Sequence, residues 1–151
     1  MAYQGTFAAG QVLTAAELNA LGAVCVLEDT FTVATSTNVD CGFGAGTEII
    51  DKGDWHDTVT NNGRIYVPAD GIYMVAASAY QLVGSPNLGR ILVFQNGAAT
   101  FGQYCAQNID STATFIADCA ANDYFNVRVW QNSGSTRTPV VRFAVWLVSE
   151  T

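Results

Sequence analysis

Apolar and polar residues alternate along most of the chain after residue 24. In 141–147 every second position is apolar, and these positions are Val141, Phe143, Val145 and Leu147. In 124–130 the apolar positions are Phe125, Val127 and Val129, and the positions between them are Tyr124, Asn126, Arg128 and Trp130. Successive side chains of a strand point to opposite faces of the sheet, so this alternation predicts strands with one face on a core.

Turn residues separate the apolar runs at short intervals. The segment Pro68–Gly71 divides residues 64–82 into two predicted strands, and Asn96-Gly97 between two apolar runs indicates a tight hairpin. The segment 31–37, FTVATST, is rich in β-branched residues and is expected to be a strand. A short polar turn follows the run TATFIADCA and precedes residue 124. Many short strands with turns between them predict an all-β sandwich or barrel.

Two of these strands are apolar on both faces. Opposite its predicted core face, the last strand carries Val140, Arg142, Ala144, Trp146 and Val148. In 72–82 one predicted face holds Ile72, Met74, Ala76 and Leu82, and the other holds Tyr73, Val75, Ala77 and Ala79. A sandwich covers only one face of each strand, so we expect a second subunit to cover the other. The predicted subunit contacts are large residues on such strands: Tyr73, Tyr80, Tyr124 and Trp146.

Residues 1–23 differ from the rest and form a predicted N-terminal arm. Thr14 and Glu17 have the spacing of a capping box, Leu13 and Leu18 that of a hydrophobic staple, and Gly22 suits the end of a helix. The resulting helix has one to two turns, which is shorter than the roughly 12–15 residues needed for marginal stability alone. It must therefore dock, either on its own domain or on a neighbouring protein. The arm residues expected to make docking contacts are Tyr3, Phe7, Val12, Leu13, Leu18 and Leu21.

Composition and charge exclude several classes of partner for this protein. Half of the 151 residues are apolar and 13% are charged, against roughly 25% charged in an average soluble domain. No apolar run approaches the roughly 18 residues of a membrane span, and no secretory signal pattern opens the sequence. The net charge of −7 disfavours nucleic acid and anionic membranes as partners. The excess of apolar residues is therefore expected at a subunit interface.

Four segments resemble the tumour necrosis factor and complement globular-head superfamily. They are RIYVPADGIYMVAASAY at 64–80, LVFQNG at 92–97, AANDYFNVRVWQ at 120–131 and RFAVWLVSE at 142–150. Asn122 stands where that family usually has glycine, and so does Ala144. The resemblance covers about residues 24–149. It implies that 24–151 is a jelly roll of about ten strands that forms a homotrimer around a three-fold axis.

The arm carries a second resemblance. GTFAAGQVLTAAELNAL at 5–21 is similar to the opening of bacteriophage virion proteins. Together the two resemblances imply a phage structural protein, made in the host cytoplasm and placed on the capsid exterior. The expected function is that of a decoration or cement protein whose arms bind the major capsid protein. The alternative is a receptor-binding trimer of a tail tip or fibre head, whose partners are a tail or baseplate protein and a host receptor.

Residues capable of catalysis do not form a recognisable motif. Asp54, His56 and Asp57 are the one acid–histidine cluster, and we expect them in a solvated loop. Three aspartates, Asp51, Asp54 and Asp57, lack the spacing of an EF-hand, and GFGAG at 42–46 lacks the ending of a phosphate-binding loop. Tryptophans 55, 130 and 146 can stack on sugars, although packing is their commoner role. We therefore expect no enzyme activity, no metal and no cofactor.

The four cysteines, Cys25, Cys41, Cys105 and Cys119, have no Cys-x-x-Cys spacing that would indicate zinc. Burial as small apolar residues is the favoured interpretation, and one disulfide stays open as the alternative.

Overall fold

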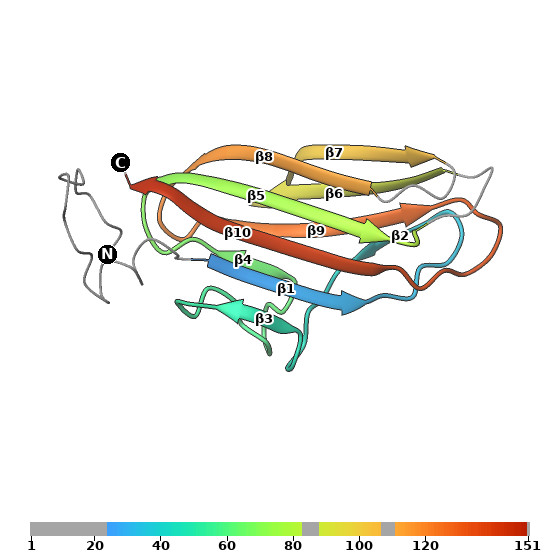
Figure 1. Cartoon of the computed structure of the whole chain (residues 1–151), viewed down its shortest axis with the longest axis horizontal. Coiled ribbons are helices and arrows are strands. Elements are labelled where there is room, and N and C mark those ends of the chain that lie inside the picture. The colour runs from blue at the N-terminus through green and yellow to red at the C-terminus, as the bar shows by residue number, and fades with distance from the viewer. Residues whose placement is uncertain (1–23, 83–87, 107–110, 151) are drawn as a thin grey trace, which may run out of the picture.

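The computed structural model describes residues 24–82, 88–106 and 111–150, with the backbone alone for 103–106. Its elements are ten strands, shown in Figure 1. They are β1 (Val24–Thr30), β2 (Thr37–Asp40), β3 (Glu48–Asp51), β4 (Arg64–Tyr66), β5 (Gly71–Tyr80), β6 (Leu88–Gln95), β7 (Ala98–Ala106), β8 (Ser111–Cys119), β9 (Tyr124–Gln131) and β10 (Val140–Glu150).

The strands form two antiparallel sheets. The first, called here the β10 sheet, has the order β3-β1-β10-β5-β8. The second, the β9 sheet, has the order β2-β9-β6-β7, and β4 also pairs with β9. Apart from the β6–β7 hairpin, neighbouring strands in both sheets are not consecutive in sequence, as β1 and β10 illustrate, which is the connectivity of a jelly roll. The predicted all-β jelly-roll sandwich of about ten strands is confirmed.

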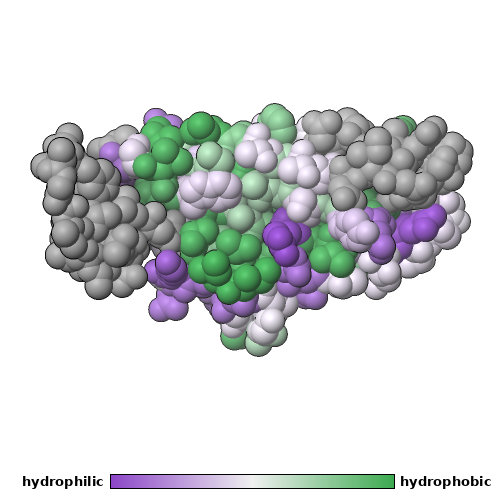
Figure 2. Space-filling model, in the orientation of Figure 1, coloured by the Kyte–Doolittle hydropathy of each residue, from purple (hydrophilic) through white to green (hydrophobic). Residues whose placement is uncertain are grey.

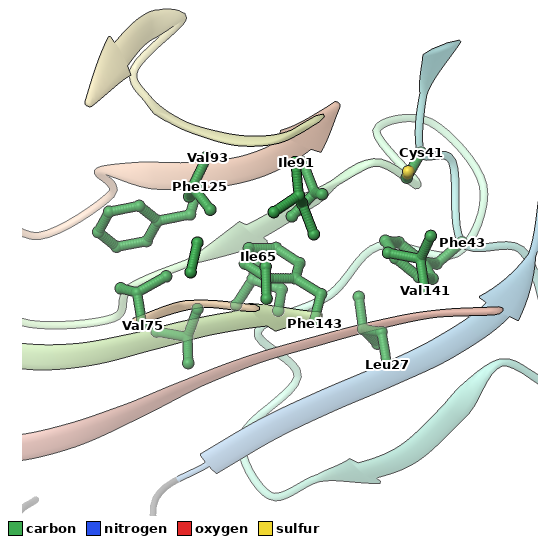
Figure 3. Close-up of a cluster of buried hydrophobic side chains, with 14 of the residues drawn as sticks. Leu27, Cys41, Phe43, Ile65, Val75, Ile91, Val93, Phe125, Val141 and Phe143 are labelled. Atoms are coloured by element: carbon green, nitrogen blue, oxygen red, sulfur yellow. The ribbon is translucent and has the colours of Figure 1, made fainter. Parts of the chain in front are cut away.

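The core lies between the sheets and follows the predicted alternation (Figure 3). In β10 the buried positions are Val141, Phe143 and Val145, and in β9 they are Phe125, Val127 and Val129. Phe43, from the segment before β3, packs on Phe143 with ring centroids 6.3 Å apart. Trp55 is buried against Tyr73, so this tryptophan packs in the core.

Turn chemistry explains two features of the sequence. Asn96 and Gly97 both have positive φ, 50° and 79°, and form the predicted hairpin between β6 and β7. Asn122 has φ 71° in the turn between β8 and β9. Asparagine tolerates this left-handed conformation better than other non-glycine residues, which explains how it replaces the glycine common in the resembling family.

Two local predictions were wrong. Residues 31–36 are irregular apart from an isolated bridge between Val33 and Arg137, so the strand expected at 31–37 is present only at its last residue. Leu82 is buried rather than on the face of Met74, because Gln81 takes a positive φ of 60° and ends the alternation after Tyr80. The arm at 1–23 and its helix lie outside the described residues, and so do all six predicted docking residues.

Candidate functional site

The outer face of the β10 sheet carries rows of side chains that cross four strands. The register aligns Val24 with Trp146, Trp146 with Met74, and Met74 with Ile116. All four alternate with core positions and therefore point outward. Cross-strand neighbours on one face have Cβ atoms about 4.5–5.5 Å apart, so the four residues form one continuous apolar row.

The next two rows change in character along the strands. The second row aligns Val26, Ala144 and Ala76, whose small alanine side chains project little from the sheet, and it ends at the polar Thr114 of β8. Glu28, Arg142, Ser78 and Thr112 make the third row. There the Nε atom of Arg142 donates to Oε2 of Glu28 at 2.7 Å. The outer face is thus apolar toward the start of β1 and polar toward its end.

Much of this apolar surface is open to solvent. Ile116 is 64% exposed and Val148 is 53% exposed, while Trp146 and Met74 are half-buried. Figure 2 shows hydrophobic residues gathered on this face, toward the end of the molecule where β10 ends. Contiguous exposed apolar patches of this kind mark interaction sites in soluble proteins.

The four predicted subunit contacts lie in three different places: on the outer face of the β10 sheet, in the core, and on the outer face of the β9 sheet. Trp146 and Tyr80 lie on the outer face of the β10 sheet, as expected of contact residues. Tyr73 is 0% exposed, so its assignment to a subunit contact was wrong. It occupies an inward position of β5 and its hydroxyl donates to the Ala69 carbonyl at 2.9 Å. Tyr124 is on the outer face of the β9 sheet and so lies on the other side of the sandwich from Trp146.

Sequence reasoning missed Met74 and Ile116 as candidates for this site. Met74 was placed on an apolar face but was passed over for its tyrosine neighbours. Ile116 was not singled out because the pairing of β8 with β5 cannot be deduced from alternation alone. Once the register is known, the alternation of each strand identifies the whole row.

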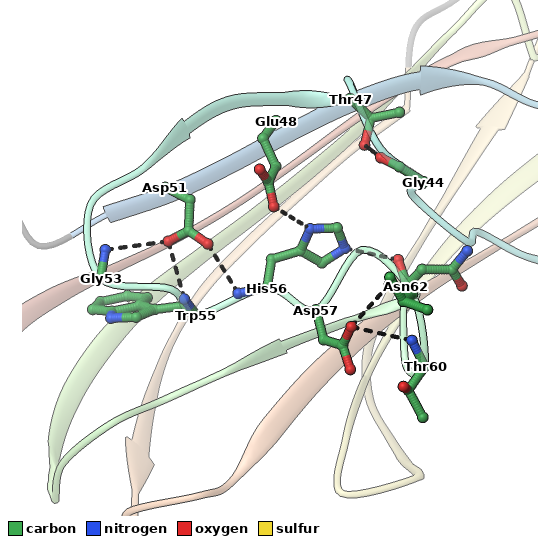
Figure 4. Close-up of polar contacts among 11 residues, drawn as sticks. Gly44, Thr47, Glu48, Asp51, Gly53, Trp55, His56, Asp57, Thr60 and Asn62 are labelled. Atoms are coloured by element: carbon green, nitrogen blue, oxygen red, sulfur yellow. Dashed lines mark hydrogen bonds and ion pairs between the residues drawn. The ribbon is translucent and has the colours of Figure 1, made fainter.

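His56 is buried rather than solvated, which corrects the prediction for this member of the cluster Asp54, His56 and Asp57, whereas Asp54 is exposed as expected. Its Nε2 lies 2.9 Å from the Asn62 carbonyl oxygen and its Nδ1 lies 2.8 Å from Oε1 of Glu48 (Figure 4). The carbonyl can only accept, so Nε2 carries a hydrogen and donates it to the Asn62 carbonyl. Asp51 accepts hydrogen bonds from the backbone N–H groups of Trp55 and His56, both at 3.0 Å. The cluster joins β3 to the loop before β4.

Three cysteines, Cys25, Cys41 and Cys119, are buried free thiols, whereas the side chain of Cys105 lies outside the described part. Burial raises the pKa of Cys25 and Cys41 well above the ordinary thiol value, and nearby aspartates add to the effect. Burial, followed by the charge of Asp123, raises the pKa of Cys119 to about 11. A thiol rather than a thiolate is a poor nucleophile, so these residues serve packing. Within the described ranges no cluster of three His, Cys, Asp or Glu side chains could hold a metal ion.

Comparison with known proteins gives the fold but no close relative. No family model and no curated protein matches the sequence. Among solved structures, the globular domain of a zebrafish complement 1qA protein aligns with a TM-score of 0.58 and 10% identity, over 85% of this chain and 99% of that one. The PRD1 vertex protein P5 aligns with a TM-score of 0.65 and 12% identity, over 83% of this chain and 73% of that one. The Eiger TNF of S. frugiperda aligns with a TM-score of 0.56 and 12% identity, over 86% and 94%.

The chain has the jelly-roll fold of the TNF and complement C1q domains. At these identities the likeness concerns the fold alone. The sequence resemblance at 64–80 and 142–150 falls on β4, β5 and β10, and the last two of these carry the outward row of Trp146 and Met74. The described part of the chain contains no helix that is long and apolar enough to cross a membrane.

Proposed function

We propose that the protein is a structural component of a virus particle and that it works as a homotrimer. The outer face of the β10 sheet carries the proposal, because it exposes the apolar row of Val24, Trp146, Met74 and Ile116. In the trimer this face turns toward the three-fold axis. Two further copies then cover it. Each Å² of apolar area removed from water stabilises the assembly by about 25 cal/mol.

Two observations support a trimer over other assemblies. The face carries the apolar row at one end, the charged pair of Arg142 and Glu28 farther along, and the exposed Tyr80 beyond that pair, so an interface on it combines apolar and polar contacts. The fold is that of TNF and C1q domains, whose sequence motifs imply assembly around a three-fold axis.

The proposed role is capsid decoration. The likeness of residues 5–21 to phage virion proteins supports it, and so does the fold likeness to the phage PRD1 vertex protein P5. In this role the arms of residues 1–23 lie across the major capsid protein. One arm binds weakly because ordering costs about 1–2 kcal/mol per residue. Three arms on one trimer bind together, which raises avidity by about 10²–10⁴-fold.

Deleting residues 1–22 tests this role. We expect the truncated chain to remain a folded trimer, with β-sheet circular dichroism like that of the full chain, and to lose binding to capsids. Sedimentation equilibrium gives the oligomeric state, and co-sedimentation with capsids gives the binding. A truncated chain that unfolds means that the arm belongs to its own core, and one that still binds capsids means that another surface makes the contact.

The alternative is a receptor-binding trimer at a tail tip or fibre head. A polar pocket on the outer face of the β9 sheet supports this alternative. Copy number separates the two roles. A decoration protein is present at hundreds of copies per particle, whereas a tail-tip protein is present at a handful. Quantifying this chain against the major capsid protein in purified particles therefore decides between them.

A further inference from the structure

A polar pocket of about 470 Å³ opens on the outer face of the β9 sheet. Its walls come from β2, β4, β6 and β9, from the loops 41–42 and 61–63, and from Gly97 in the turn between β6 and β7. The side chains that the argument uses are Asp40, Arg64, Phe94, Tyr124, Asn126 and Arg128. The pocket lies across the sandwich from the apolar row, so the proposed trimer leaves it open.

Arg64 supplies an unpaired positive charge to this pocket. Its Cζ lies 4.1 Å from the centroid of the Tyr124 ring, and its Nη1 donates to the hydroxyl of Tyr66 at 3.2 Å. Within the described part of the chain, no carboxylate forms an ion pair with it. Stacking holds the guanidinium in place while leaving other N–H groups to donate. Such a fork matches a carboxylate with two parallel hydrogen bonds.

Arg128, in contrast, is already neutralised. Its Nε and Nη2 donate to the two carboxylate oxygens of Asp40 at 2.7 and 3.1 Å, and its Cζ lies 4.7 Å from the Phe94 ring centroid. The remaining lone pairs of Asp40 and the amide of Asn126 can bind hydroxyl groups. The pocket therefore places one unpaired guanidinium group beside several groups that can form hydrogen bonds with uncharged hydroxyls.

The loops that wall the pocket are held rigidly. A Cβ atom at Gly42 would lie 2.9 Å from Oδ1 of Asn62, and one at Gly63 would lie 2.9 Å from the Cys41 carbonyl oxygen. The two loops approach this closely because both positions lack a side chain. The Asn62 carbonyl accepts from the Phe43 N–H at 2.6 Å and from Nε2 of His56 at 2.9 Å. The pocket is thus formed before any ligand arrives.

We propose that this pocket binds a saccharide that carries a carboxylate. Arg64 binds the carboxylate, and Asp40 and Asn126 bind ring hydroxyls. The volume falls within the range of about 300–1,000 Å³ typical of small-molecule sites. A phosphorylated ligand suits the pocket poorly, because its two or more charges meet one unpaired arginine and the carboxylate of Asp40. The net charge of −7 makes nonspecific anion binding elsewhere on the surface unfavourable.

Saturation-transfer NMR on the full chain tests the proposal, with D-glucuronic acid as the probe and D-glucose and acetate as comparison compounds. We expect transfer to the ring protons of glucuronic acid and much weaker transfer to the other two. Arg64→Gln should lower the affinity for glucuronic acid by about tenfold or more, because it removes the positive charge and the two parallel hydrogen-bond donors. Lys52→Gln is the matched control, since it removes the same charge from an exposed side chain that does not line the pocket.

Three results overturn the proposal. They are no transfer to glucuronic acid, equal transfer to glucose or to acetate, and an Arg64→Gln variant that binds as well as Lys52→Gln. None of them bears on the trimer or on capsid binding, because the pocket and the apolar row lie on opposite sides of each subunit.

Discussion

Trp146 of β10 lies directly opposite Met74 of β5, and both side chains point away from the core. An apolar pair on the outer face of a sheet is unfavourable in water unless another protein covers it. Val24 and Ile116 extend the pair on either side, so the apolar surface crosses four adjacent strands. This pair is the place where a single charge should disturb assembly most.

The variant Met74→Glu should convert the proposed trimer to monomers. A buried carboxylate without a partner costs several kcal/mol, and three-fold symmetry repeats the change in every subunit. Sedimentation velocity measures the oligomeric state. Val59→Glu is the control, because Val59 is 84% exposed in the loop that follows Asp57. If Met74→Glu sediments like the wild-type chain, the outer face of the β10 sheet is not the interface.

His56→Phe should lower the free energy of unfolding by about 1–3 kcal/mol. The phenyl ring fills the site but leaves the Asn62 carbonyl and the Glu48 carboxylate without their hydrogen bonds to the imidazole. Glu48→Gln is the matched variant and should cost less, because its side-chain amide can still form a hydrogen bond with Nδ1. Urea unfolding followed by circular dichroism measures both. A His56→Phe variant as stable as the wild-type chain would show that the cluster adds nothing to stability.

Asp123→Asn should change how stability depends on pH. The Asn96 amide donates to Oδ1 of Asp123 at 2.7 Å and, with the Ala120 N–H and the Gln95 amide, holds the pKa of Asp123 below its ordinary value of 3.8. The ionised form is therefore the one that the fold favours. Its stabilisation is present above pH 3.8 and is lost as the pH falls through the lower, folded-state pKa.

The wild-type chain should accordingly exceed Asp123→Asn in stability at neutral pH, and the difference should shrink on acidification. Urea midpoints measured from neutral pH to below 3.8 check this. A difference that stays constant over the whole range would exclude ionisation of Asp123 as its source.

Gly71→Ala should destabilise the fold by about 1–3 kcal/mol. A Cβ atom there would lie 2.5 Å from the backbone carbonyl oxygen of Ser149, at the register shift between β5 and β10. Backbone atoms cannot move aside as a flexible side chain can. Gly44→Ala is the control, since a Cβ atom at Gly44 meets nothing within 4 Å. Thermal unfolding of the two variants compares them, and equal midpoints would contradict the predicted clash.

Much of the fold could be predicted because the strands alternate so regularly. Phe125, Phe143 and Val145 face the core as their spacing indicates, and Asn96-Gly97 forms its hairpin. Alternation specifies which residues share a face but not which face is the core, nor which strands are neighbours. Tyr73 was assigned to the outer face because alternation does not show which face is the core. Ile116 was missed because alternation does not show that β8 pairs with β5.

The polar features depend on contacts between distant segments and were harder to predict. His56 is buried because Glu48, eight residues earlier, and the Asn62 carbonyl meet its two ring nitrogens, and no local pattern reports that arrangement. The pocket around Arg64 likewise assembles from four strands and two loops. Arg64 and Tyr124 are 60 residues apart, and only the pairing of β4 with β9 brings them together.

The gradient from Trp146 to Arg142 along β10 also gives the assembly a direction. Val24, where the described chain begins, is aligned with Trp146 at the apolar end of the face. In a closed three-fold assembly, Val24 of each of the three subunits therefore lies at the same end. The proposed trimer thus has two unlike ends, and the pockets around Arg64 lie on its circumference between them.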